Sequence, residues 1–226
     1  MNFVRIALLV LRKDFAIEVK SREVLYTTLF FAVSCVLVFA FALVREGRVV
    51  ENASAGILWI AIAFAGTLAL GRTFERERYG ETLRALLLAP APRPAIYVGK
   101  LLGIMLLMCS VELILVPLVA FWFGAGLFVR PLLLAGLLLT GTVGFAAVGT
   151  LFAAMLVRSR TRDVLLPILL YPITVPVIIG GVSGTTALLQ APPDVALAQM
   201  WMALLLAFDI VFVTLALWTF EPLMTE

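Results

Sequence analysis

The sequence has no histidine and only two cysteines among its 226 residues. Without histidine, the chain lacks the side chain that ordinarily titrates near neutral pH and the commonest metal ligand. Cys35 and Cys109 lie inside apolar segments and form no CxxC pair, so neither a zinc or redox motif nor a disulfide framework is predicted. We therefore expect no metal site and no cofactor bound by this chain alone.

Catalytic motifs are also absent. No G-x-x-x-x-G-K-[ST] occurs, so the chain has no P-loop to bind the phosphates of ATP. Neither G-x-S-x-G nor H-E-x-x-H is present, and the lack of histidine excludes several catalytic schemes. We expect no catalytic residue, no enzymatic activity of its own and no nucleic-acid partner.

Charged residues are scarce as well. They make up 14% of the chain, and hydrophobic residues make up 63%, whereas soluble domains have about 25% charged and about 45–50% apolar residues. A soluble core of this size would leave too little polar surface to face water. Several apolar runs reach the roughly 20 residues that a helix needs to cross a hydrocarbon core. The lipid bilayer is therefore the predicted solvent of this chain.

Six transmembrane helices are predicted, which makes the protein an all-α integral membrane protein with a single domain over residues 1–226. The spans are Val24–Val44, Ser54–Gly71, Ala95–Phe123, Pro131–Val157, Val164–Val182 and Val195–Phe220. An amphipathic N-terminal segment, residues 1–23, precedes them. Its apolar stretch ends after six residues at Arg12-Lys13-Asp14, so it is expected to be a retained interfacial segment and not a signal peptide.

Basic residues predict the orientation. Thirteen Lys and Arg residues fall in the N-terminal segment and in the loops after spans 2 and 4, against three in the alternate loops. Cytoplasmic loops retain positive charge, so both termini are expected in the cytoplasm. The remaining basic residue, Lys100, lies near the start of span 3, where its long side chain can reach the interface.

The loop after span 2, residues 72–94, contains a short amphipathic pattern. An apolar stripe recurs at helical spacing in Leu83, Leu86 and Leu87. Polar residues occupy other positions of the segment, namely Glu77, Glu81 and Arg84. A Pro-Ala-Pro sequence at residues 90–92 ends the helix. The pattern fits either a helix that lies among lipid headgroups or one that docks into a groove on a cytoplasmic partner.

The order of features in this region carries a family resemblance. It runs through Phe74-Glu-Arg-Glu-Arg, Thr82-Leu83, Leu86-Leu87-Leu88-Ala89-Pro90, Arg93, Ile96-Tyr97 and Gly99-Lys100-Leu101, and it resembles the membrane subunits of ABC-2 type exporters. Residues 162–179, with prolines at 167, 172 and 176, resemble span 5 of the CcmB family, the so-called haem exporter permease of cytochrome c maturation. The length and the span count agree with that family.

The resemblance implies a function and partners. A permease subunit of this kind uses the loop after span 2 to couple its movement to ATP hydrolysis on a separate ATP-binding cassette subunit. The implied assembly is a homodimer within a larger complex in the bacterial inner membrane, together with a haem-handling membrane protein. Two roles stay open, haem export and release of a haem-loaded chaperone, and the lack of histidine favours the second. The alternatives are an ABC-2 exporter of a lipid or small hydrophobic compound and a non-transporting membrane scaffold.

Span 5 contains three prolines, Pro167, Pro172 and Pro176. Each removes a backbone donor and tends to kink a helix. The prolines fit either a static kink or a hinge that opens or closes a pathway. We also expect the glycines at 180, 181 and 184 to end this helix.

Two carboxylates, Glu112 in span 3 and Asp209 in span 6, lie within apolar runs. Intramembrane carboxylates are functional candidates, but a protonated carboxyl bonded to a neighbouring helix is a structural alternative. Small residues begin span 3 and line span 4, which predicts either close internal packing or a dimer seam. They are Gly99, Gly103, Gly136, Gly141, Gly144 and Gly149.

Overall fold

The computed structural model describes residues 3–45, 48–49, 53–79, 92–157, 159 and 161–223, with the backbone alone for 44–45, 48–49, 73–79 and 221–223. Within these residues the chain forms seven α-helices and one short β-ribbon. The helices are α1 (Phe3–Ser21), α2 (Glu23–Leu43), α3 (Ala53–Tyr79), α5 (Arg93–Phe123), α6 (Pro131–Met155), α7 (Arg162–Leu189) and α8 (Val195–Leu223). The ribbon pairs β1 (Val44–Arg45) with β2 (Arg48–Val49) in antiparallel register.

Six of the described helices, α2, α3, α5, α6, α7 and α8, are long and apolar enough to cross a membrane. The prediction of an all-α membrane protein with six spans is therefore confirmed. The ribbon between α2 and α3 was not predicted. Strands of two residues give no detectable alternation of side chains, which is the signal that identifies a strand in a sequence.

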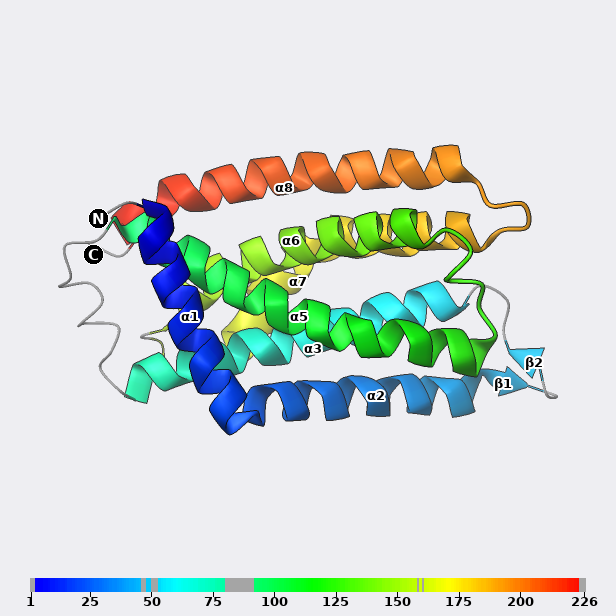
Figure 1. The fold of residues 1–226 in the computed structure, drawn as a ribbon, viewed down its shortest axis with the longest axis horizontal. Coiled ribbons are helices and arrows are strands. Elements are labelled where there is room, and N and C mark those ends of the chain that lie inside the picture. The colour runs from blue at the N-terminus through cyan, green and yellow to red at the C-terminus, as the bar shows by residue number, and fades with distance from the viewer. Residues whose placement is uncertain are drawn as a thin grey trace.

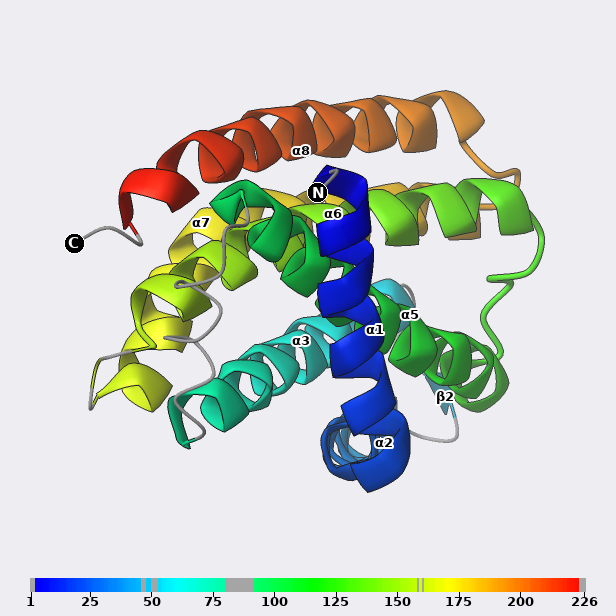
Figure 2. The same cartoon turned by 60° about the vertical axis from the view of Figure 1, so that its left-hand side comes forward.

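The six long helices run side by side and alternate in direction (Figure 1). Helix α3 lies inside the bundle and contacts α2, α5, α6 and α7, whereas α8 packs mainly on α6 and α7. Helix α1 crosses the end of the bundle at which α3 ends and α5 and α7 begin (Figures 1 and 2). We call this the basic end, because Arg22, Arg72, Arg93 and Arg162 belong to it. An even number of spans brings the last turn of α8 back to the same end.

Helix α1 packs on α5 through one apolar face formed by Ile6, Ala7 and Val10. A glycine makes this approach possible, since a Cβ atom at Gly99 would lie 2.7 Å from both the Ala7 carbonyl oxygen and Val10 Cβ. The opposite face of α1 exposes large apolar side chains, among them Val4, Leu8 and Leu9. With one face on the bundle and apolar groups on the other, α1 has the character expected of an interfacial helix.

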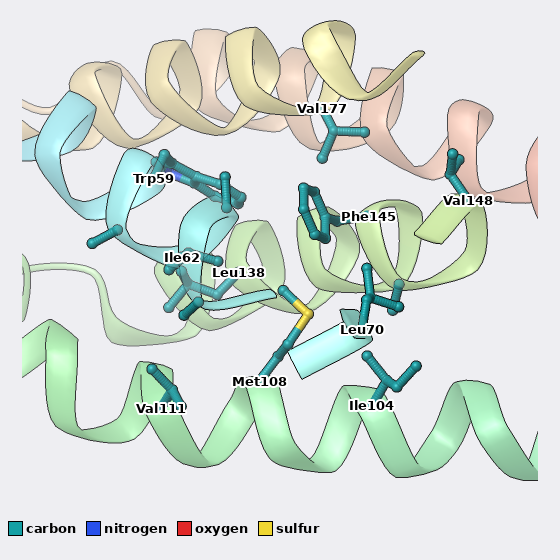
Figure 3. Close-up of a cluster of buried hydrophobic side chains, with 14 of the residues drawn as sticks. Trp59, Ile62, Leu70, Ile104, Met108, Val111, Leu138, Phe145, Val148 and Val177 are labelled. Carbon is teal, nitrogen blue, oxygen red and sulfur yellow. The ribbon is translucent and has the colours of Figure 1, made fainter. Parts of the chain in front are cut away.

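Large side chains from α3, α5, α6 and α7 fill the middle of the bundle (Figure 3). Trp59 and Leu70 of α3 are almost fully buried, as are Met108 of α5 and Phe145 of α6. The four glycines of span 4 make room for neighbours. Added Cβ atoms at Gly136, Gly141, Gly144 and Gly149 would collide with Met202, Trp59, Asp209 and Leu70 respectively. Internal packing, one of the two predicted uses of these glycines, is therefore confirmed.

The expected end of the fifth span is wrong. Helix α7 continues without interruption through Gly180, Gly181 and Gly184 to Leu189. These glycines make room for side chains of other helices. A Cβ atom at Gly181 would collide with Trp59 and one at Gly184 would lie 2.7 Å from Leu137, while one at Gly180 would lie 3.0 Å from Leu205. Water cannot satisfy free backbone groups inside a bilayer, so a glycine that would weaken a soluble helix stays helical here.

Candidate functional site

The predicted coupling residues lie next to the basic end. The backbone of Glu77 belongs to the last turns of α3, which extends to Tyr79. The other five, Glu81, Leu83, Arg84, Leu86 and Leu87, lie outside the described residues. The docking stripe therefore stays a prediction. What the structure does describe is the pair of helices, α3 and α5, that lead into and out of this region.

Two side-chain hydrogen bonds hold α3 against α7. The indole Nε1 of Trp59 donates to Thr185 Oγ1 at 2.9 Å, and both residues are buried. Nearer the basic end, Thr67 Oγ1 donates to the Tyr171 hydroxyl at 3.2 Å. Inside a bilayer such polar contacts replace those that water would otherwise provide. They fix the position of α7 along α3.

A third contact, made by Arg162, links the same two helices at the basic end. Arg162 is the first residue of α7 and is only 3% exposed. Its Nη2 donates to the backbone carbonyls of Leu70, at 3.0 Å, and of Gly71. The contacts with Arg162, Tyr171 and Thr185 thus extend over roughly 35 Å of α7, at 1.5 Å of rise per residue. These three contacts therefore tie the position of α7 to that of α3 along most of the length of α7.

Sequence reasoning missed this role of Arg162. In the sequence Arg162 is one of three arginines in a short loop, where it contributes to the predicted orientation and begins the segment that resembles span 5 of the CcmB family, but neither observation predicts a contact with α3. Its place directly before an apolar run was the one available signal, but that place equally fits a side chain that reaches water. Only the packing of α7 on α3 distinguishes the two.

The three prolines, Pro167, Pro172 and Pro176, all lie inside α7. Pro167 lies between the Arg162 and Tyr171 contacts, and Pro172 and Pro176 lie between the Tyr171 and Thr185 contacts, so α7 is held to α3 before, within and after the proline segment. The hinge stays a prediction, and prolines are where helices most often kink.

Glu112 lies on α5 with 5% of its surface exposed. The hydroxyl of Thr142, a fully buried residue of α6, donates to Glu112 Oε1. The partner expected under the structural alternative is therefore present. A carboxyl bonded across a helix seam stabilises the packing of α5 on α6 without needing to change its protonation state.

Asp209 lies on α8, is 6% exposed, and faces α6. A Cβ atom at Gly144 would lie 2.6 Å from Asp209 Oδ1, so the carboxyl occupies the space that this glycine leaves. Oδ1 is buried and accepts no hydrogen bond from the residues that the structure describes. Glu112 and Asp209 thus lie on different sides of α6, and they do not form a paired acidic site.

Lys100 differs from its expected place at the interface. It is 3% exposed, and its Nζ lies 2.7 Å from Asp14 Oδ2 of α1. Asp14 follows Ala7 and Val10 at helical spacing, so it belongs to the face of α1 that packs on α5. An acidic residue on the apolar face of an amphipathic segment was the signal that could have predicted this ion pair.

No group of three His, Cys, Asp or Glu side chains that could hold a metal ion occurs among the described residues. Cys35 and Cys109 are half-buried free thiols on α2 and α5. What the described residues offer is a set of polar contacts between neighbouring helices.

Comparison with known proteins agrees with this arrangement. The family model of the CcmB protein matches residues 5–222, which is nearly the whole chain. The chain belongs to the CcmB family. Its CcmB relatives include the heme exporter protein B of Pseudomonas aeruginosa, which is 28% identical over 198 residues, 88% of this chain and 87% of the relative. The heme exporter protein B of Rhodobacter capsulatus is 27% identical over 180 residues, 76% of this chain and 78% of the relative.

Proposed function

We propose that this chain is the membrane permease subunit of an ABC transporter complex in cytochrome c biogenesis. It couples ATP hydrolysis by a separate subunit to haem export or to release of a haem-loaded chaperone. Membership of the CcmB family over residues 5–222 carries this proposal, and both curated relatives bear the name heme exporter protein B. It favours this function over a lipid exporter and over a non-transporting scaffold.

The coupling path runs from the loop after α3 into the bundle. A partner that pushes on residues 72–94 displaces the end of α3, because residues 72–79 are the last turns of that helix. Arg162 holds the carbonyls of Leu70 and Gly71, so the start of α7 moves with α3. Pro167, which lies between the Arg162 and Tyr171 contacts, is where α7 bends as its first turn follows the end of α3. This sequence of movements makes α7 the element that opens or closes the pathway.

The proposed partners follow from the same family. ATP binds to the cassette subunit, and a haem-handling membrane protein supplies the haem. The permease acts as a homodimer in the bacterial inner membrane. The excess of basic residues at one end supports cytoplasmic termini. The lack of histidine supports release of a haem-loaded chaperone, because the chain lacks the commonest axial ligand of haem.

Co-purification from detergent tests the proposal. The wild-type chain should bring down an ATP-binding cassette subunit, and the double variant Leu83→Asp, Leu86→Asp should lose it while still inserting in the membrane. Leu88→Asp is the matched control, since Leu88 lies off the predicted stripe and should retain the partner. Undiminished recovery of the ATPase with the double variant would contradict the docking assignment. Absence of any ATPase with the wild-type chain would contradict the function.

A further inference from the structure

A groove of about 610 Å³ lies between α1, α2 and α5 at the basic end. Its apolar lining includes Leu11 and Phe15 of α1 and Leu106 and Leu107 of α5. The groove is open at Gly103, where the nearest atom to an added Cβ would be Leu11 Cδ1 at 3.9 Å. A space of this size and lining can hold part of an elongated apolar molecule.

The charged lining of the groove is mainly basic. Four basic side chains, Lys13, Arg22, Arg72 and Lys100, line it together with two carboxylates, Asp14 and Glu18. Asp14 is shared by two ammonium groups, at 3.1 Å from Lys13 and 2.7 Å from Lys100. Glu18 accepts a hydrogen bond from the backbone N–H of Leu25 at 2.9 Å. Arg72 Nη1 also lies 3.9 Å from Glu23 Oε1, at the edge of the groove. Four basic side chains therefore face three carboxylates, which leaves one positive charge in excess.

The charged and apolar parts lie at different depths along α5. Lys100 lies near the start of this helix, and Leu107 follows it by seven residues, or roughly 10 Å along the axis. Arg22 and Arg72 lie where α2 begins and where the membrane-spanning part of α3 ends. The groove thus has its cations at the basic end, with Lys100 buried against α1, and its apolar walls further along α5 toward the middle of the bundle.

We propose that this groove binds one phospholipid with an anionic headgroup, taken from the leaflet at the basic end. The headgroup lies near Arg22 and Arg72, and an acyl chain follows Gly103 and Leu107 between α1 and α5. Such a lipid would fill the space under α1 and hold this helix on the bundle. The proposal does not depend on what the complex transports.

A porphyrin is the other amphiphile of similar chemistry, since it also combines an apolar body with carboxylates. The observations favour the lipid. The groove lies beside α1, whose outer face is apolar, so it is next to the bilayer. Among the described residues, its lining has no histidine, cysteine or methionine to bind iron, and the hydroxyl of Tyr26, another possible ligand, accepts a hydrogen bond from Arg22 Nη1 at 3.4 Å.

Photo-crosslinking tests the proposal on the complex purified from membranes and placed in phosphatidylcholine nanodiscs. The probes are phosphatidylglycerol and phosphatidylcholine, each with a diazirine in the acyl chain, and labelled peptides are mapped by mass spectrometry. We expect phosphatidylglycerol to label residues 103–110 and α1, and phosphatidylcholine to label the same residues at least about fivefold less. A fivefold difference corresponds to ~1 kcal/mol, the typical contribution of one basic residue near an anionic lipid.

Two variants separate headgroup from chain. Arg22→Gln with Arg72→Gln should weaken competition by unlabelled phosphatidylglycerol about fivefold for each charge removed. Gly103→Leu fills the groove without changing its charge and should abolish the labelling. Gly56→Leu is the matched control, since a Cβ at Gly56 meets nothing within 4 Å and the residue is not part of the groove lining. It should label as the wild type does.

Three results would overturn the proposal. They are equal labelling by the two lipids, labelling that Gly103→Leu leaves intact, and displacement of the probe by haem at lower concentration than by phosphatidylglycerol. The last would identify a porphyrin site in place of a lipid site.

Discussion

The hydrogen bond between Thr142 and Glu112 allows a quantitative test of whether the intramembrane carboxyl is structural. The variants are Glu112→Gln, Glu112→Leu, Thr142→Val and the double variant Glu112→Leu, Thr142→Val. Gln keeps both an acceptor and a donor at nearly the same volume, so it can still bond to the Thr142 hydroxyl. Leu and Val each remove one partner and leave the other group unpaired in the seam between α5 and α6.

The magnitude follows from the burial of the two groups. Glu112 is 5% exposed and Thr142 is 0% exposed, so neither can turn to water when its partner is removed. An unpaired buried polar group costs about 1–3 kcal/mol. Side-chain hydrogen bonds between membrane helices contribute an average of ~0.6 and at most ~1.7 kcal/mol in double-mutant cycles. We expect the sum of the two single losses to exceed the measured loss of the double variant by a coupling energy in that range.

Two assays read out the cycle. Thermal unfolding of the purified complex gives the coupling energy, and formation of c-type cytochromes in cells gives the activity. Glu112→Gln should assemble and retain most of the activity, whereas Glu112→Leu should lose more of both. A Gln variant that assembles stably but is inactive would refute the reasoning, because ionisation of the carboxyl would then be part of the working cycle.

Three further predictions concern the contacts of α7, the packing of α1 and the topology. Arg162→Met should lower the stability of the complex by about 1.5–3 kcal/mol through lost charge-assisted hydrogen bonds and should reduce activity while the ATPase still co-purifies; activity at the wild-type level would contradict the coupling path. Gly99→Ala should destabilise the complex by about 1–3 kcal/mol through overpacking against α1, measured by thermal unfolding, whereas Gly56→Ala should be neutral or stabilising. In a background without the native cysteines, Gln190→Cys, at the exposed position just after α7, should react with an impermeant thiol reagent on intact spheroplasts and Thr161→Cys only after lysis. The reverse labelling would contradict the six-span orientation.

The sequence was sufficient for the number and approximate limits of the spans, because the cost of placing polar groups in lipid makes apolar length a strong signal. It failed at the end of α7. We expected Gly180, Gly181 and Gly184 to end the helix, as glycines tend to do in water-soluble proteins. In lipid the lack of alternative hydrogen-bond partners keeps such a segment helical, and the glycines serve as packing sites for Trp59 and Leu137.

The contacts between helices could be predicted only in part. Glu112 and Asp209 were identified as unusual from their apolar neighbours, but the partner of Glu112 comes from a different span and has no local signal. The Lys100–Asp14 ion pair and the bonds of Arg162 depend likewise on how two distant segments pack. Charge in a loop and charge buried at a helix end look alike until the packing of the helices is known.

The most direct test of the proposed function is the amount of haem-bound c-type cytochrome in cells that lack this chain. We expect the mature cytochromes to be lost, to return when the wild-type chain is supplied, and to remain absent when the P-loop lysine of the ATPase partner is replaced. Normal cytochrome levels in cells without this chain would contradict a role in cytochrome c biogenesis, and normal levels with the inactive ATPase would contradict coupling to ATP hydrolysis.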